Sequence, residues 1–366
     1  METNNNLKIK DVTLSRNLTD HVLIVAEEFR NHAPGGIAAV LQYYYPHFET
    51  FKYLPTFKSR KFIDKLNYVG LSYFRLFWKL RTDREIQVVH IHTAADGSFR
   101  QNARLLDIAK RFGKKVILHI HASRFKDFYN EADEKGKQKI LSTLKKADLL
   151  VVLAQSWKEW FLSIGIDPAR IEILHNITAF PIRKEIPDDG KLHLLFLGEI
   201  GERKGVFDIL KALSEHRNDL KEKIFFHIGG NKRENELKGV IFESKLDSFV
   251  RFEGFVFGDK KRELLNQADV FILPSRNEGL PISILEAMSY GCAIISSPVG
   301  GIPEVVTDNG ILVEPGNTGQ IYEAIKTLTD RELVKTMGTR SLEAVQTYLP
   351  NAVMNHLAQI YAKLED

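Results

Sequence analysis

The 366-residue sequence contains one cysteine, Cys292, and no long uninterrupted apolar run. A single thiol cannot build a disulfide framework, so the composition is typical of a reducing compartment. Every stretch of about 18 residues is broken by a charge, Gly, Pro or Ser, which argues against a membrane-spanning helix. The first residues carry no basic segment followed by an apolar core, and we expect no secretion signal. We therefore expect a soluble or peripheral protein of the cytoplasm.

Two common phosphate-binding motifs are also absent. No expected strand is followed by G-x-x-x-x-G-K-[ST], and the glycines after the first expected strand do not follow G-x-G-x-x-G. The sequence thus lacks the signatures of P-loop nucleotide hydrolases and of dinucleotide-binding domains. The first strand leads instead to Gly35 and Gly36 at the start of a helix. Paired glycines there either form a plain tight turn or let the backbone approach a diphosphate closely.

Short apolar runs alternate with amphipathic segments from Asp20 to about residue 180. This alternation is typical of a doubly wound parallel sheet, whose strands are buried on both faces by the connecting helices. Helices are expected at residues 99–112 and 134–146. The expected strands are residues 21–26, 86–92, 115–121, 148–153 and 171–174.

The same alternation starts again after a turn-rich segment, residues 181–190, which we interpret as an interdomain linker. The predicted fold class is therefore α/β, with two Rossmann-like doubly wound domains facing across a cleft. Ligands of such sheets bind at the carboxyl ends of the strands. The elements expected after the linker are strands at residues 192–197, 224–228, 250–252, 269–273, 293–296 and 310–313, and helices at residues 320–328, 331–348 and 352–364.

Positive charge is concentrated in the first half of the chain. Residues 1–180 hold 28 Lys and Arg against 19 Asp and Glu, whereas the remainder holds 23 against 28. The excess is greatest in residues 51–84, where nine basic residues accompany two acidic ones and nine aromatic ones. A basic, aromatic-rich segment of this kind can lie on an anionic membrane surface. The alternative is a helix that packs by its aromatic side chains and leaves its charges solvated.

One loop and the helix after it carry the most specific pattern. The apolar strand at residues 269–273 leads into a loop that presents Glu278. A helix then begins near Pro281, carries Glu286 on its second turn and stops near Gly291. The N-terminus of such a helix offers unpaired N–H groups and a positive dipole end to an anion. Two carboxylates beside it can hold hydroxyl groups while the amides hold phosphate, a combination that suits a nucleotide sugar.

Two basic residues follow another strand end. The strand at residues 192–197 leads into Gly198, and Arg203 and Lys204 lie just before a helix that is expected to begin at Val206. Basic side chains oppose the helix dipole at this position, so a fixed anion explains their placement better than bulk solvent does. Two charge-assisted hydrogen bonds, at about 1.5–3 kcal/mol each, would speed the loss of a diphosphate by about 10² to 10⁴.

Four histidines occur at two strand ends of the first domain. His90 and His92 share one face of their strand, and His119 and His121 share one face of theirs. We expect His90 and His119 to be neutral imidazoles satisfied within the sheet. His121 is last on its strand, and we expect it to face the cleft and contact the sugar or the acceptor. A metal cluster is the competing interpretation, but no carboxylate or cysteine lies at ligand spacing nearby.

In this order, these features resemble the retaining glycosyltransferases of family 4, which have the GT-B fold. The resemblance extends from about Asp20 to the C-terminus, and its most specific part is Glu278-x7-Glu286 followed by Gly301-x-Pro303-Glu304. The sequence departs from the family pattern at Asn176-Ile177 and at Gly229-Gly230-Asn231-Lys232. The matching landmarks are Gly35-Gly36, His121, Asn176, Gly198, Arg203-Lys204-Gly205, Ala268-Asp269-Val270, the two glutamates and residues 297–304.

The resemblance implies that the two domains bind different substrates. Residues 1–180 would form an N-terminal acceptor-binding domain, and residues 181–345 a C-terminal domain that binds the nucleotide sugar. Residues 346–366 would form a helix that crosses back to the N-terminal domain. Transfer would retain the anomeric configuration, by front-face attack through an oxocarbenium-like state, and would need no metal or other cofactor.

The resemblance also assigns roles to single residues. Arg203 and Lys204 would stabilise the diphosphate leaving group. Glu278 would hydrogen-bond the sugar hydroxyls and Glu286 the ribose hydroxyls, while His121 would face the reacting sugar. The residues implied to contact the donor are Gly35, Gly36, Gly198, Arg203, Lys204, Glu278, Gly279, Leu280 and Glu286.

The function predicted is transfer of a sugar from a nucleotide-diphosphate sugar, with a UDP-sugar favoured. The acceptor would be a saccharide or a polyprenyl-diphosphate-linked saccharide in surface polysaccharide or glycolipid synthesis. Peripheral contact at the inner face of the cell membrane, through residues 51–84, would bring the enzyme to such an acceptor. No nucleic-acid partner is expected. The alternatives are a nucleotide-sugar epimerase or phosphorylase of the same architecture, or a non-catalytic nucleotide-sugar-binding protein.

Overall fold

Six parallel strands form the first sheet of the computed structural model, in the order β2-β1-β3-β4-β5-β6. The structure describes residues 12–30, 35–56, 62–121, 123–180 and 189–365, so that residues 181–188 of the expected linker lie outside the described residues. The strands are β1 (Val22–Ala26), β2 (Lys52–Pro55), β3 (Val88–Thr93), β4 (Lys115–Ile120), β5 (Leu149–Val152) and β6 (Ile171–Ile173).

A second sheet of six parallel strands follows, in the order β12-β11-β10-β7-β8-β9. Chain order reverses between β7 and β10 in this sheet and between β1 and β3 in the first, which makes these two places the switch points where ligands of open α/β sheets bind. The strands are β7 (Leu192–Glu199), β8 (Ile224–Asn231), β9 (Val250–Gly254), β10 (Val270–Leu273), β11 (Ala293–Ser296) and β12 (Gly310–Leu312).

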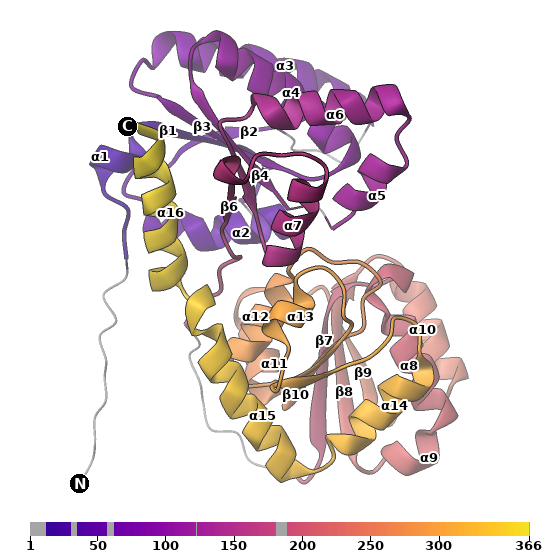
Figure 1. The fold of residues 1–366 in the computed structure, drawn as a ribbon. Helices are drawn as coiled ribbons and strands as arrows, with labels where there is room; N and C mark the ends of the chain where they lie inside the picture. The colour runs from indigo at the N-terminus through magenta and orange to yellow at the C-terminus, as the bar shows by residue number, and fades with distance from the viewer. Residues whose placement is uncertain (1–11, 31–34, 57–61, 122, 181–188, 366) are drawn as a thin grey trace, which may run out of the picture.

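Helices cover both faces of each sheet, and the sheets form two separate lobes (Figure 1). This arrangement confirms the predicted α/β class with two doubly wound domains. The helices of the first lobe are α1 (Arg16–Thr19), α2 (Gly36–Tyr44), α3 (Phe62–Thr82), α4 (Asp96–Arg111), α5 (Phe125–Asn130), α6 (Glu134–Lys146) and α7 (Gln155–Ser163). The later helices are α8 (Val206–Glu215), α9 (Arg217–Leu220), α10 (Glu234–Glu243), α11 (Gly258–Gln267), α12 (Ile282–Ser289), α13 (Ile302–Val305), α14 (Thr318–Thr327), α15 (Arg331–Ala344) and α16 (Pro350–Glu365).

Alternating side chains of the first sheet fill two different cores. Leu23, Val89 and Leu118 belong to one core, whereas Ile24, Val88 and Ile117 belong to the other, which also contains side chains of α2 and α16. Both faces are apolar because helices cover both, as expected for a parallel sheet. His90, His92 and His119 have the same parity as the second set, and therefore point toward α2 and α16.

The last helix belongs spatially to the first lobe. α16 packs beside α1 and over β3, although it follows the second sheet in the chain (Figure 1). Its side chains Met354, Leu357 and Tyr361 are fully buried in the core that contains β1 and β3. The C-terminal segment therefore ties the two lobes together, because α15 lies on the second lobe and α16 on the first.

One strand was missed by the sequence analysis. Residues 52–55 form β2, which pairs in parallel with β1 at the edge of the first sheet, within the basic segment for which we expected a membrane-surface segment or a packed helix and no strand. Its four residues include Pro55, and an edge strand of this length has no clear alternating pattern. The helical part of the segment is α3. The structure does not describe the side chains of residues 62–67 in this helix.

Within the described part of the chain, no helix combines the length and the apolar character that crossing a bilayer requires.

Gly300 is held where a side chain has no room. Its φ is +58°, and a Cβ at this position would lie 2.0 Å from the carbonyl oxygen of Glu278. We expect Gly300→Ala to lower the free energy of unfolding by about 2–4 kcal/mol, because the new methyl group adds a backbone clash to an unfavourable φ. Gly239 in α10 has open space around it and no positive φ, so Gly239→Ala should instead stabilise the protein by about 0.5–1 kcal/mol. Urea unfolding of the two variants tests this, and equal stabilities would contradict it.

Candidate active site

The loops that follow β7 and β10 meet at the switch point of the second sheet. After β7, a 3₁₀ turn over Glu202–Lys204 presents the two basic residues, and α8 begins at Val206 as expected. Gly205 has φ of +75°, and a Cβ there would lie 2.3 Å from the carbonyl oxygen of Pro274, just after β10. The absence of a side chain at this glycine lets the basic turn pack directly against the end of β10. β7 extends to Glu199, so Gly198 lies within the strand rather than after it.

The turn and the loop bring opposite charges together. Lys204 Nζ lies 2.5 Å from Glu278 Oε1, and Arg203 Nη1 lies 3.8 Å from the same oxygen. Lys204 and Glu278 are largely buried, with side chains 14% and 8% exposed, whereas Arg203 is 40% exposed. Arg203 also donates to the carbonyl oxygen of Asn277 at 3.4 Å. A buried lysine with an exposed arginine beside it can bind a second anion while Glu278 stays paired.

The backbone after Glu278 is fixed by its carbonyl groups. The carbonyl oxygen of Gly279 accepts from Gly301 N at 2.7 Å, and that of Leu280 accepts from Asn176 Nδ2 at 2.6 Å. No described residue accepts a hydrogen bond from the N–H groups of Gly279 and Leu280. These two N–H groups lie in the loop just before Pro281, the N-cap of α12.

This loop also contacts the first lobe. Asn277 Nδ2 donates to Asp127 Oδ2 at 3.1 Å, and Asn176 comes from the first lobe as well. A Cβ on Gly279 would lie 3.3 Å from Leu153 Cδ1 and 3.5 Å from the carbonyl oxygen of His121. The structure therefore places His121 directly against the loop that carries Glu278.

Glu286 lies on α12 and is bound from both lobes. Its carboxylate accepts a hydrogen bond from Tyr43 on α2, and Lys261 Nζ on α11 lies 2.6 Å from it. Burial, followed by the negative charge of Glu286, raises the pKa of Tyr43 well above its usual value, so the phenol stays protonated and donates. Glu286 is only 4% exposed. Glu286 was predicted from the sequence, but its partners Tyr43 and Lys261 were not, because no motif marks them.

The start of α2, where we expected a diphosphate contact, also holds an acidic side chain. Gly35 has φ of +150°, and a Cβ there would lie 2.8 Å from Glu27 Oε1. The Glu27 carboxyl accepts from the backbone N–H of Ala38 in the first turn of α2, and burial raises the pKa of this carboxyl. An acidic side chain thus already occupies part of the helix N-terminus, although Gly36 has open space around it. The sequence analysis missed Glu27, which immediately follows β1.

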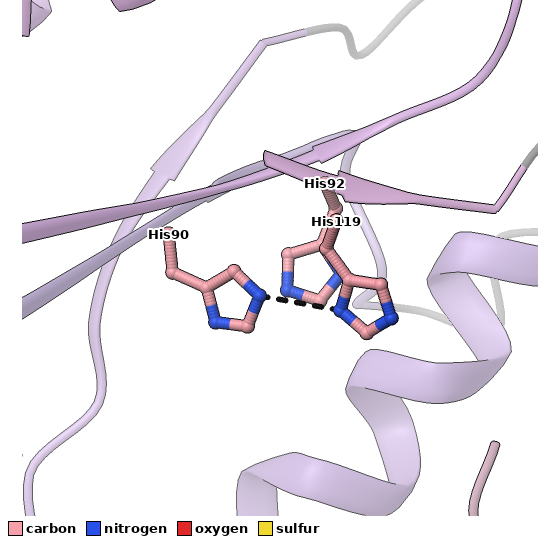
Figure 2. A group of neighbouring side chains, drawn as sticks. All are labelled: His90, His92 and His119. Carbon is pink, nitrogen blue, oxygen red and sulfur yellow. Dashed lines mark hydrogen bonds between the residues drawn. The ribbon is translucent and has the colours of Figure 1, made fainter. Parts of the chain in front are cut away.

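The histidines of β3 and β4 form two hydrogen-bonded groups. His121 Nε2 and His92 Nδ1 are 2.9 Å apart. His90 Nε2 lies 3.2 Å from His119 Nδ1, the contact dashed in Figure 2, and His90 Nδ1 lies 2.7 Å from the hydroxyl of Tyr361 on α16. His90 is satisfied on both ring nitrogens, as expected. His119 is satisfied on one only, because its Nε2 is buried without a partner among the described residues.

Burial keeps these rings neutral. It lowers the pKa of His90 and of His121 to about 3, and it lowers the pKa of His92 and His119 well below 6.5. The rings also lower one another's pKa, since a charge on one would repel a charge on the next. At neutral pH the cluster therefore works by hydrogen bonding and not by its charge.

Three of these four rings lie close enough together to be candidate metal ligands. His90, His92 and His119 each offer a ring nitrogen, and these atoms lie within 4.8 Å of one another. The fit is poor, because the described residues add no carboxylate or thiolate to the group and a hydrogen bond already joins two of the three rings. A divalent ion would bring two uncompensated charges into an apolar core. The hydrogen-bonded interpretation explains the geometry better.

A further acidic residue binds the two lobes together. Glu304 in the Gly301-x-Pro303-Glu304 sequence accepts from the backbone N–H groups of Gln155 at 2.8 Å and Ser156 at 2.9 Å. These are the first N–H groups of α7 in the other lobe, where a carboxylate compensates the helix dipole. The glutamate of this landmark thus has an interlobe role here, which its position in the sequence did not reveal.

Comparison with known proteins gives the same assignment as this geometry. Residues 15–178 match the family model described as "Glycosyltransferase Family 4", and residues 191–331 match "Glycosyl transferases group 1". The chain belongs to the family 4 glycosyltransferases. Among curated relatives, the uncharacterized glycosyltransferase MJ1069 of Methanocaldococcus jannaschii is 29% identical over 81% of this chain and 77% of that protein. The amylovoran biosynthesis glycosyltransferase AmsK of Erwinia amylovora is 24% identical over 66% of this chain and 61% of that protein.

Solved structures support the fold of this glycosyltransferase. The structure of Anabaena Alr3699/HepE in complex with UDP and glucose matches with a TM-score of 0.71 and covers 93% of this chain and 99% of that one. At 15% identity, this likeness shows the fold alone. The GT-B architecture that the sequence analysis predicted is therefore confirmed, and the protein is a transferase.

The buried histidines of this glycosyltransferase make its stability sensitive to acid. Each is neutral when folded but takes up a proton near pH 6.5 when unfolded, so stability is fully present above that pH and falls as the pH drops toward 3. From pH 6.5 to 5.5 we expect a loss of about 1 kcal/mol for each of the four rings. Urea unfolding at pH 7.5, 6.5 and 5.5 measures this slope, which should become smaller in His90→Leu. A flat profile over this range would contradict the prediction.

Proposed function

We propose that the protein is a retaining transferase that uses a nucleotide-diphosphate sugar, with a UDP-sugar favoured, and glycosylates a saccharide or a polyprenyl-diphosphate-linked saccharide. The observation that carries this proposal is the convergence of Lys204 and Arg203 on Glu278 at the β7–β10 switch point. The available N–H groups of Gly279 and Leu280 lie in the same loop. Cations and amides suit a diphosphate, and a buried carboxylate suits sugar hydroxyls.

The proposed reaction breaks the bond between the anomeric carbon and the diphosphate and forms one to an acceptor oxygen on the same face. Lys204 and Arg203 neutralise the charge that develops on the departing diphosphate. That diphosphate accepts the proton of the attacking hydroxyl, so the protein need not supply a base. Glu278 orients the sugar through its hydroxyls, and Glu286 binds the ribose. His121, a neutral ring, donates a hydrogen bond at the reacting sugar.

The biological setting is also proposed. AmsK is named for amylovoran biosynthesis, and HepE was solved with UDP and glucose, which support a UDP-sugar donor and a role in surface polysaccharide or glycolipid synthesis for this chain. Such an acceptor would place the protein in the cytoplasm at the inner face of the membrane.

The donor site is tested by ligand-induced stabilisation. A panel of UDP-, GDP- and ADP-sugars should include one that raises the melting temperature, because a ligand that binds only the folded state stabilises it. Lys204→Met should weaken UDP binding in calorimetry by about 10- to 100-fold, the value of one charge-assisted hydrogen bond. It should lower the rate of sugar transfer or donor hydrolysis at least as much.

Lys223→Met is the matched control for this experiment. Lys223 also pairs with a carboxylate at 2.6 Å, that of Asp219, but the pair is exposed and lies outside the site. It should leave UDP affinity unchanged, and circular dichroism should show both variants folded. If no sugar nucleotide stabilises the protein, or if Lys204→Met binds UDP as the unmodified protein does, the proposed donor site is wrong.

Membrane contact is proposed from the outer face of α3. Leu71, Phe74 and Trp78 lie at helical spacing and are 40%, 63% and 57% exposed, and the rings of Phe74 and Trp78 stack. Leu76 and Leu80 on the opposite face are buried. Exposed basic residues, Arg75 and Arg81 among them, accompany the aromatic face. Apolar rings with cations beside them suit the headgroup region of an anionic bilayer.

Sedimentation with anionic liposomes tests this contact. The protein should bind vesicles of phosphatidylglycerol and lose binding as salt is raised, because each basic residue near the surface contributes about 1 kcal/mol that salt screens. The double variant Phe74→Ser/Trp78→Ser should bind much less. Phe242→Ser on α10 removes a 74% exposed ring from the other lobe and should have no effect. Binding that is absent, or equal in all three proteins, would refute the contact.

A further inference from the structure

His92 and His121 differ in their surroundings although a hydrogen bond joins them. His92 is 1% exposed and lies on β3 under α2, where its ring approaches that of Tyr44 edge to face. His121 immediately follows β4 and is partly accessible. The distance between Nδ1 of His92 and Nε2 of His121 is 2.9 Å, so one of these two nitrogens must carry the proton of the bond.

The other ring nitrogen of His92, Nε2, indicates which of the two nitrogens carries the proton. Nε2 of His92 is fully buried and has no partner among the described residues. A neutral imidazole has one N–H and one lone pair, and burial keeps the ring neutral by lowering its pKa well below 6.5. A buried N–H without an acceptor is rarer in proteins than an unused lone pair. The proton of His92 is therefore on Nδ1, and Nε2 carries the bare lone pair.

We propose that His92 is a positioning residue, which fixes His121 in the tautomer that carries its proton on Nδ1. The Nδ1–H of His92 donates to Nε2 of His121, so that this nitrogen is an acceptor and the proton of His121 must be on Nδ1. No described residue binds Nδ1 of His121. This inference rests on the proposed function for its consequence, since it makes His121 a neutral hydrogen-bond donor to the sugar or its diphosphate and excludes it as a base.

The other two histidines provide a built-in comparison. His90 and His119 are equally buried and bond to each other, and His90 also bonds to Tyr361, whereas neither bonds to His121. A role confined to packing would make His90 and His92 equivalent, because both rings fill the same core between β3, α2 and α16. Only His92, which is hydrogen-bonded to His121, can fix the tautomer of His121.

Nitrogen NMR of histidine-labelled protein tests the tautomer without any donor. Long-range ¹H–¹⁵N correlations should show His121, assigned by loss of its signals in His121→Asn, protonated on Nδ1 and bare on Nε2 at pH 7. His92→Asn places an amide N–H close to the former Nδ1–H and should keep this pattern, whereas His92→Leu should release it. A His121 protonated on Nε2, or charged, would overturn the inference whether or not the proposed function is right.

Turnover of a UDP-sugar tests the consequence. We expect His92→Leu to lower kcat by about 10- to 100-fold with little change in KM, since one hydrogen bond at the reacting sugar is lost or reversed. His92→Asn should restore most of the rate, and His90→Leu should leave kcat within about 3-fold while it destabilises the protein as much. Equal losses in His90→Leu and His92→Leu, or no rescue by His92→Asn, would overturn the positioning role. If no UDP-, GDP- or ADP-sugar is turned over, the proposed function fails while the NMR result stands by itself.

Discussion

The buried ion pair between Lys204 and Glu278 organises the second lobe around its switch point. Its partners are 74 residues apart in the chain and lie on loops that follow adjacent strands, β7 and β10. Charges so little exposed persist only when paired, because removal from water costs several kcal/mol for each ion. The pair therefore sets how the two loops approach each other, and the missing side chain of Gly205 lets them do so. Arg203 and the amide of Gly279 are positioned with the pair, because they are the chain neighbours of Lys204 and Glu278.

The first lobe contributes neutral histidines and the carboxyl groups of Glu27 and Asp127 to the surroundings of this site. Burial keeps its histidines uncharged, and the carboxyl group of Glu27 accepts a hydrogen bond from the N-terminus of α2, so that it partly compensates the helix dipole. A diphosphate between the lobes would then find its countercharges on one side, at Lys204 and Arg203, and hydrogen-bond donors on the other.

Most of the fold could be predicted because its signals are local. Alternating apolar runs and helical segments located the described strands other than β2, and Glu278, Arg203 and Lys204 could be placed at strand ends because parallel strands all end at one edge. The partners of these residues could not be predicted. Tyr43 and Lys261 reach Glu286 from helices distant in the chain, and no motif marks them. Tyr43 depends on how the two lobes pack and Lys261 on how α11 packs beside α12, and periodicity within one element encodes neither.

That packing links Glu286, the proposed ribose ligand, to the arrangement of the lobes. Tyr43 of the first lobe donates to Glu286 of the second, Glu304 of the second caps α7 of the first, and Asn176 fixes the carbonyl of Leu280. A ribose that binds Glu286 must share this carboxylate with Tyr43 and Lys261 or displace one of them. Since Tyr43 and Glu286 belong to different lobes, displacement of the tyrosine would remove an interlobe bond at the moment of donor binding. If the ribose binds Glu286 as proposed, the contacts that fix Glu286 would couple donor binding to the contact between the lobes.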